Sequence, residues 1–300
     1  MIAGLPCLLA AGTCAAHVGR AAPAGRAPFV ALLAGLLVTS GALYARGVAR
    51  LWRRAGVGRG IRIVDTLRFA LGMAALAAAL LSPIDALAGR SFAMHMIEHE
   101  MLMVVAAPLL VLARPLEAWA WALPRGTGQR LAAWTRAPAI ARTWRAATAP
   151  VAATIVHALA LWSWHLPALF AAALASEPLH VLQHACFFAS ALAFWWAMFG
   201  GVTRAPGPVC VALLFATMLQ TSALGALLTF APSAWYAGAA EPRAFGLAPL
   251  EDQQLGGLIM WVPGGLAYLV AALVIVSAWL LPSPLPSAGD DSQRGKRAPA

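Results

Sequence analysis

The sequence contains few charged residues. Only 11% of its 300 residues are charged and 61% are hydrophobic, with a mean hydropathy of +0.76, whereas an average soluble domain is about 25% charged. The low charge excludes a disordered chain. Four cysteines are too few for a disulfide-stapled scaffold, and the lack of a Gly-X-Y repeat excludes collagen. The composition therefore predicts a protein that crosses a membrane several times.

Seven apolar stretches each approach the length of about 20 residues that a helix needs to cross a bilayer. The runs are continuous and do not alternate, which argues against membrane strands. We therefore predict an all-α transmembrane bundle with spans near 29–48, 64–82, 92–113, 150–170, 179–199, 208–230 and 256–281.

The formal net charge of +10 arises from arginines between the apolar runs, so it indicates topology and not nucleic-acid binding. Six arginines lie between the last turn of span one and the start of span two, from Arg46 to Arg62, and six lie in the gap between spans three and four, from Arg114 to Arg145. The opposite gaps hold only Arg90 and Arg243. The positive-inside rule then predicts an N-terminus outside the cell and a cytoplasmic C-terminus.

Three segments are predicted to differ from the transmembrane domain 28–281. Residues 1–27 resemble a signal peptide followed by a short N-terminal segment, although a positive start is lacking. The loop 114–149 is rich in tryptophan and arginine, which favours short helices on the cytoplasmic membrane surface. Residues 282–300 combine proline, serine and charge, as a disordered cytoplasmic tail does.

Histidines gather at one level of the predicted bundle. Two His-x-x-x-His pairs begin spans three and five, and a further histidine ends span four. Because orientation was assigned from arginine alone, it is informative that five of the seven histidines fall in the outer third of the membrane. Residues four apart on a helix face the same way, about 6 Å apart along the axis. The predicted metal ligands are His95, His99, His180, His184, His165, Asp252 and Met260.

Neighbouring residues support this interpretation. Methionines 94, 96, 101 and 103 surround the first pair, and thioether with imidazole favours copper. Carboxylates and amides that orient imidazoles are expected around the ligands. His157 lies about 12 Å deeper than His165, so it is predicted to bond a neighbouring side chain and not the same ion. The residues predicted to surround the ligands are Glu98, Asp85 and Gln253.

Two other functions fit part of this pattern. Facing histidines on neighbouring helices are also the axial ligands of a haem b that carries electrons. The run His95-Met96-Ile97-Glu98-His99 matches the H-x-x-E-H pattern of zinc proteases, with Glu98 as general base. The pattern is short, and it lacks a third ligand and a path for a peptide substrate.

The assembled motifs resemble the CtaG-type assembly factors of caa3-type cytochrome c oxidase over about residues 28–281. The matching stretches are Met94 to His99, Ala106 to Leu110, Trp164 to Pro167, His180 to His184 and, most specifically, Asp252-Gln253-Gln254-Leu255-Gly256-Gly257 leading into Met260-Trp261, with Ser82 to Asp85 also fitting. In that family glutamine more often occupies the position of Glu98, which argues against the protease.

The resemblance implies a multi-pass protein of the bacterial cytoplasmic membrane that is not an enzyme. It implies a role in oxidase maturation, most simply the supply of copper to the metal centres of the oxidase. The expected partners are the lipid bilayer, oxidase subunits and a periplasmic copper donor, with no nucleic acid.

Overall fold

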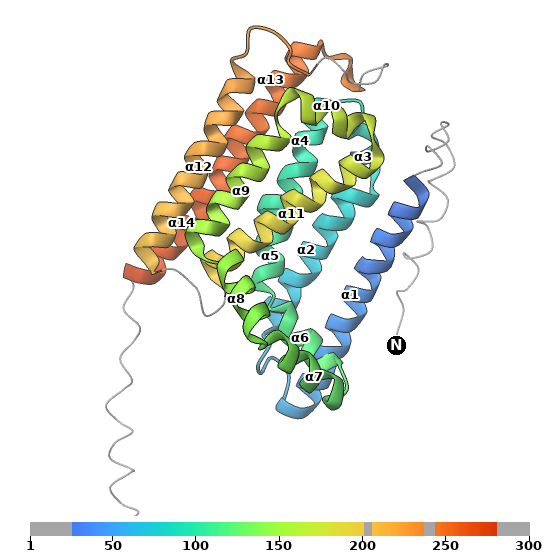
Figure 1. Ribbon diagram of the computed structural model, residues 1–300, viewed down its shortest axis with the longest axis vertical. Coiled ribbons are helices and arrows are strands. Elements are labelled where there is room, and N and C mark those ends of the chain that lie inside the picture. The colour runs from blue at the N-terminus through green and yellow to red at the C-terminus, as the bar shows by residue number, and fades with distance from the viewer. Residues whose placement is uncertain (1–25, 201–205, 237–243, 281–300) are drawn as a thin grey trace, which may run out of the picture.

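The structure is a bundle of helices. The computed structural model describes residues 26–200, 206–236 and 244–280, and every regular element in these ranges is helical. The long helices lie side by side along the long axis of the molecule (Figure 1). Six helices are long and apolar enough to span a membrane, and a seventh span results if one bent pair counts as a span. The prediction of an all-α membrane bundle is confirmed.

Four spans are continuous helices, and two are composite. Continuous apolar runs form helices here because a helix satisfies all its backbone hydrogen bonds internally, as the bilayer requires. The continuous helices are α1 Arg26–Ala55, α2 Ile63–Leu81, α11 Glu177–Phe199 and α12 Gly207–Thr229. The composite spans are α4 Phe92–Glu100, η3 Met101–Ala106 and α5 Ala107–Leu112, and then α13 Pro249–Ile259, η5 Met260–Gly264 and α14 Gly265–Leu280.

Each composite span contains a π-helical turn, η3 or η5. Pro263 lies inside η5, and a proline cannot donate the backbone hydrogen bond of a regular helix. Such wide turns occur mostly as single insertions at functional sites. The apolar runs 92–113 and 256–281 predict uninterrupted helices, and nothing in their hydropathy indicates these turns.

The fourth predicted span, 150–170, is wrong at its end. Helix α9 covers only Pro150–Trp164, and Pro167 begins a separate helix, α10 Pro167–Ala175. Leu166 is extended, as the residue before a proline prefers to be. The break leaves His165 at the end of α9, because a proline removes a backbone hydrogen bond that a continuous helix needs.

Short helices connect the spans. The predicted loop 114–149 contains α6 Pro115–Ala122, α7 Arg125–Thr135 and α8 Pro138–Ala147, and α8 meets α9 at a bend of 64°. Their position on a membrane surface stays a prediction. Further short elements are α3 Pro83–Ala88 and η4 Ala244–Gly246. The predicted tail 282–300 lies outside the described residues, and of the predicted leader 1–27 only the start of α1 is described.

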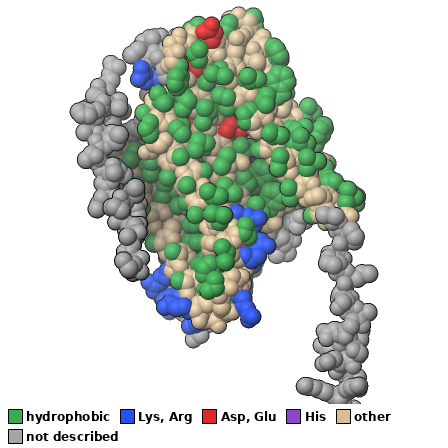
Figure 2. Space-filling view, turned by 180° about the vertical axis from the view of Figure 1, so that it is seen from behind, with side chains coloured by type: hydrophobic (Ala, Val, Ile, Leu, Met, Phe, Trp, Pro, Cys, Tyr) green, Lys and Arg blue, Asp and Glu red, His purple; other side chains and the backbone are tan. Residues whose placement is uncertain are grey.

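The surface is divided by charge along the bundle axis. Figure 2 shows hydrophobic side chains covering the middle of the molecule, while basic side chains gather mainly at one end. We call the other end, where α4, α11 and α13 begin and α9 ends, the histidine end. Which of the two ends faces the cytoplasm stays a prediction.

Glycines let α13 approach its neighbours closely. A side-chain Cβ atom at Gly256 would overlap the ring of Phe92 on α4 and lie 3.1 Å from Cγ of Met96. A Cβ at Gly257 would lie 2.7 Å from the backbone oxygen of Gly225 on α12. Small residues at such contacts are the usual means by which membrane helices pack. The packing fixes α4, which carries the first histidine pair, between α13 and the rest of the bundle.

Candidate metal centre

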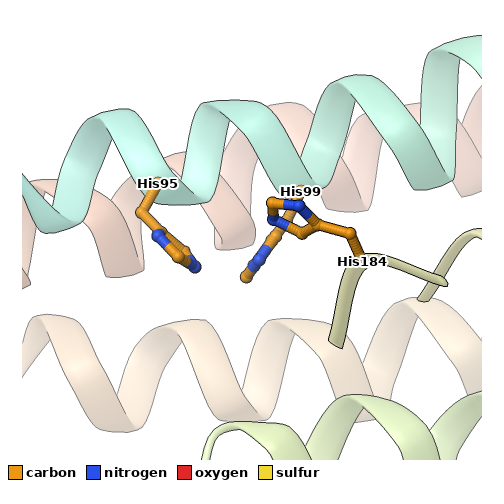
Figure 3. Close-up of side chains that lie close together, drawn as sticks. All are labelled: His95, His99 and His184. Atoms are coloured by element: carbon orange, nitrogen blue, oxygen red, sulfur yellow. The ribbon is translucent and has the colours of Figure 1, made fainter. Parts of the chain in front are cut away.

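The two predicted histidine pairs meet inside the bundle. The ring centroids of His95 and His99 on α4 are 4.3 Å apart, as are those of His180 and His184 on α11. Across the helices, the centroids of His99 and His184 are 5.2 Å apart. Figure 3 shows the rings of His95, His99 and His184 turned toward one another between the helices. The structure thus brings four of the predicted ligands together.

Two sets of ligand atoms are close enough to hold an ion. One nitrogen from each of His95, His99 and His184 lies within 4.8 Å of the others, and so do one atom each from His95, Glu98 and His180. A four-coordinate ion with bonds of about 2.0–2.1 Å to nitrogen needs ligand separations of about 3.3 Å. Small rotations of the side chains therefore complete either set. Glu98, which was predicted to surround the ligands, offers a ligand atom itself.

The burial of these side chains fits an ion. His95 and His99 are almost completely inaccessible to solvent, at 0% and 1% exposed, and neither ring nitrogen of His99 has a hydrogen-bond partner among the described residues. Buried polar atoms in folded proteins are nearly always hydrogen-bonded. A metal ion would satisfy the nitrogen lone pair that the protein leaves unused.

A carboxylate lies beside the imidazoles. Glu98 is fully buried, and its Oε1 atom is 3.8 Å from Nδ1 of His184. An ionisable group at this depth is costly in a bilayer unless another charge compensates it. A cation bound by the histidines provides that compensation, so the donor set and its charge suit a metal cation.

His165 joins the cluster from a third helix. Its ring centroid is 5.9 Å from that of His99. Its Nδ1 atom is 2.7 Å from the backbone oxygen of Leu161, and its Nε2 atom is 3.5 Å from Sδ of Met96. The hydroxyl of Tyr236 donates to the backbone oxygen of His165 at 2.5 Å. Burial raises the pKa of the Tyr236 phenol, so this hydroxyl keeps its proton and stays a donor.

Asp252 holds the beginning of α4. Its carboxylate accepts hydrogen bonds from the hydroxyl of Ser91 at 2.7 Å and from the backbone nitrogens of Phe92 at 2.6 Å and Ala93 at 3.1 Å. A carboxylate at a helix N-terminus satisfies free backbone donors and the helix dipole. The structure therefore gives Asp252 a positioning role for His95, one turn further along α4.

The remaining predicted residues lie around the cluster. Gln253 accepts from the backbone nitrogen of Trp235 at 2.6 Å and thereby fixes the segment that carries Tyr236. Asp85 is half-buried in the first turn of α3, outside both sets of ligand atoms. Met260 is buried in η5, one turn beyond Gly256. Their roles toward an ion stay predictions.

His157 is separate from the cluster. Its Nδ1 atom is 3.1 Å from the hydroxyl of Ser190 and its Nε2 atom 3.3 Å from that of Tyr268, and its ring stacks on Phe194. Both nitrogens are therefore paired within the protein. The prediction that His157 bonds neighbouring side chains is confirmed.

The chain matches the model of a known protein family. Residues 42–281 match the family described as cytochrome c oxidase caa3 assembly factor (Caa3_CtaG). The chain belongs to this family. All the histidines of the cluster lie within the matched residues, and the family resemblance drawn from the motifs is confirmed.

Similarity to individual proteins is more distant. The chain is 28% identical over 257 residues to two proteins described as uncharacterized, Mb0105 of Mycobacterium bovis and MT0111 of Mycobacterium tuberculosis. The matches cover 82% of this chain and 38% of each relative, so the chain spans about two fifths of the length of these curated relatives. No solved structure matches.

Proposed function

We propose that this assembly factor binds copper at the histidine cluster and supplies it to the metal centres of cytochrome c oxidase. The observation that supports this most is the buried set of His95, His99 and His184 within a membrane bundle of the oxidase assembly family. The family places the protein in oxidase maturation. The cluster supplies a reason for that role, because imidazoles gathered inside a membrane hold a metal ion.

The chemistry of the donors favours copper. Imidazole nitrogens suit copper and zinc, and a methionine thioether at the same cluster favours the softer cuprous ion. Copper acts here as cargo. It arrives and leaves by ligand exchange, so the proposed role requires no catalytic step.

The proposed place of exchange is the histidine end of the bundle. His180 lies in the first turn of α11 and is only half-buried, whereas His95 and His99 are buried. An ion therefore reaches His180 first and then the rings on α4. With the sidedness predicted from the arginines, this entrance faces the periplasm or cell exterior, where a copper donor delivers the ion.

The packing of the rings argues against haem. His99 contacts the ring of Phe187 with centroids 4.5 Å apart, and His95 contacts Phe170 at 5.0 Å. A haem needs a flat space between two axial histidines, and the packing of Phe187 and Phe170 against two of the candidate imidazoles favours the smaller ion. An ion fits the same cluster without displacing these rings.

Copper content tests the proposal. We expect His99→Ala and His184→Ala to remove most of the copper bound by the purified protein and to lower the copper content of the oxidase in cells. His157→Gln, which changes a paired imidazole outside the cluster, serves as the matched control and should retain both. Membrane levels of all variants are measured by immunoblot. Normal oxidase copper in the two cluster variants would overturn the proposal, and a Soret band in the wild type would favour haem.

A further inference from the structure

A sulfur atom faces one of the imidazoles at the edge of the cluster. Sδ of Met96 lies 3.5 Å from Nε2 of His165. Both side chains are buried, at 0% and 3% exposed. They come from different helices, since Met96 lies in α4 and His165 follows α9.

Proton accounting shows that this contact is not an ordinary hydrogen bond. The backbone oxygen of Leu161 can only accept, so Nδ1 of His165 carries the proton in their 2.7 Å contact. In a neutral imidazole Nε2 then bears a lone pair and no proton. A thioether sulfur has no proton to offer. Two lone pairs therefore face each other in a buried place.

The separation of the two atoms suits a shared metal ion. Metal bonds of about 2.0 Å to nitrogen and 2.3 Å to sulfur, meeting at a tetrahedral angle, place the two ligand atoms about 3.5 Å apart. The observed distance is 3.5 Å. His99 lies beside the pair, with its ring centroid 5.9 Å from that of His165 and its nitrogens without hydrogen-bond partners.

We propose that Met96 and His165, with His99 as third donor, form a cuprous position beside the imidazole set. The inference rests on the proposed function and deepens it, because it names the residues that hold the cuprous ion. Soft thioether sulfur selects Cu(I) over harder divalent ions. Met96 is thus a ligand, although the sequence alone does not distinguish it from the other methionines near the histidine pair.

The surrounding structure holds this donor pair in place. Cγ of Met96 lies over Gly256, where a side chain would leave it too little room. Tyr236 binds the backbone oxygen of His165 and stacks on Phe92 with ring centroids 4.7 Å apart. Segments from the C-terminal part of the chain therefore position two donors that belong to other helices.

The ligand set that contains Glu98 and the position at Met96 and His165 imply a direction in which copper moves. The set of His95, Glu98 and His180 contains a carboxylate and includes the half-buried His180. The position at Met96 and His165 is buried and contains sulfur. Cuprous ion therefore exchanges from the harder, more accessible ligands to the softer, enclosed ones, with His99 adjacent to both His184 and His165.

X-ray absorption at the copper edge tests this position. The full chain is purified in detergent and loaded with Cu(I) under anaerobic conditions. We expect a sulfur neighbour at about 2.3 Å beside the nitrogen neighbours. Met96→Leu, which conserves volume, should remove the sulfur signal and weaken Cu(I) binding at least about tenfold. Met103→Leu, a buried methionine of the neighbouring turn, is the matched control and should retain both.

The outcomes separate this inference from the proposed function. A wild type that binds copper through nitrogen alone would overturn the cuprous position and leave the copper function standing. A sulfur signal that survives in Met96→Leu would also overturn the assignment. A wild type that binds no copper would overturn both proposals. Because the wild-type spectrum alone decides the first case, misfolding of a variant cannot leave the inference untested.

Discussion

At the scale of single residues, Asp252 links the seventh span to the histidine site. Its carboxylate accepts three hydrogen bonds from Ser91, Phe92 and Ala93 at the start of α4. Loss of a side chain that caps a helix N-terminus costs about 0.5–2 kcal/mol, and a buried donor left without a partner costs about 1–3 kcal/mol. We expect Asp252→Ala to lower stability by about 2–4 kcal/mol in total, measured as thermal unfolding in detergent, and to weaken copper binding by displacing His95.

The two roles considered for Asp252 predict different spectra. If Asp252 only positions α4, Asp252→Asn keeps the ligand shell of bound copper unchanged in the absorption spectrum. If the carboxylate is a ligand, as the sequence pattern predicts, an oxygen neighbour disappears. Glu251→Ala is the matched control, since this exposed carboxylate accepts only a local hydrogen bond from Ala248. Loss of an oxygen neighbour in Asp252→Asn alone would contradict the positioning role.

The sequence predicts the histidine pairs well because helical periodicity alone decides that residues four apart share a face. It does not predict that Met96 faces His165. Residues 95 and 96 are about 100° apart around the helix, and His165 approaches only because α9 ends there. The sequence also does not predict the hydrogen bonds of Asp252, since they depend on how α13 packs against α4 and not on any local pattern.

At the scale of elements, the glycines of α13 decide how closely the helices pack. A Cβ atom at Gly257 would lie 2.7 Å from backbone atoms of Gly225 and Thr229, which cannot move aside as a side chain can. We expect Gly257→Ala to destabilise the bundle by about 1–3 kcal/mol, measured by unfolding the protein in increasing concentrations of a denaturing detergent. At Gly41 the same change meets no atom within 4 Å and should stabilise α1 by about 0.5–1 kcal/mol.

Gly257→Ala and Gly41→Ala together separate the effect of helix–helix packing from the effect of helix propensity. Both changes favour the helical backbone equally, so a difference in sign between them arises from contact with the neighbouring helix. Equal stabilisation in both would show that α12 and α13 are not in close contact. Copper binding should fall in Gly257→Ala alone, because α13 also carries Gly256 and Asp252, which contact α4.

Hydropathy finds most membrane helices here but not their interruptions. Runs of apolar residues predict where α2, α11 and α12 lie, because the bilayer imposes their length. The π turns η3 and η5 leave hydropathy unchanged, and only Pro263 signals one of them. The fourth span is predicted to be longer than α9 because the apolar run continues past His165 into α10. Pro167 marks the break between the two helices.

At the scale of the whole molecule, charge and donors occupy opposite ends. The α1–α2 connection and helices α6 to α8 lie at the end of the bundle away from the histidine end (Figure 1), and basic side chains gather mainly at one end of the surface (Figure 2). Arginines occur in the α1–α2 connection and in α7 and α8. Arg62 lies just before α2, and its hydrogen bond to Asp65 raises the pKa of its guanidinium. Cytoplasmic loops are enriched in arginine and lysine, so this separation predicts that the histidine end lies on the side away from the cytoplasm.

Labelling of single cysteines decides the sidedness. In a chain whose native cysteines are replaced by alanine, we expect Glu251→Cys at the histidine end to react with a membrane-impermeant maleimide in intact cells. Arg130→Cys in α7 should react only after the cells are opened. Both positions are exposed, so the difference reports which side of the membrane each occupies. The reverse pattern would place the histidine end in the cytoplasm and would contradict the proposed loading of copper from outside the cell.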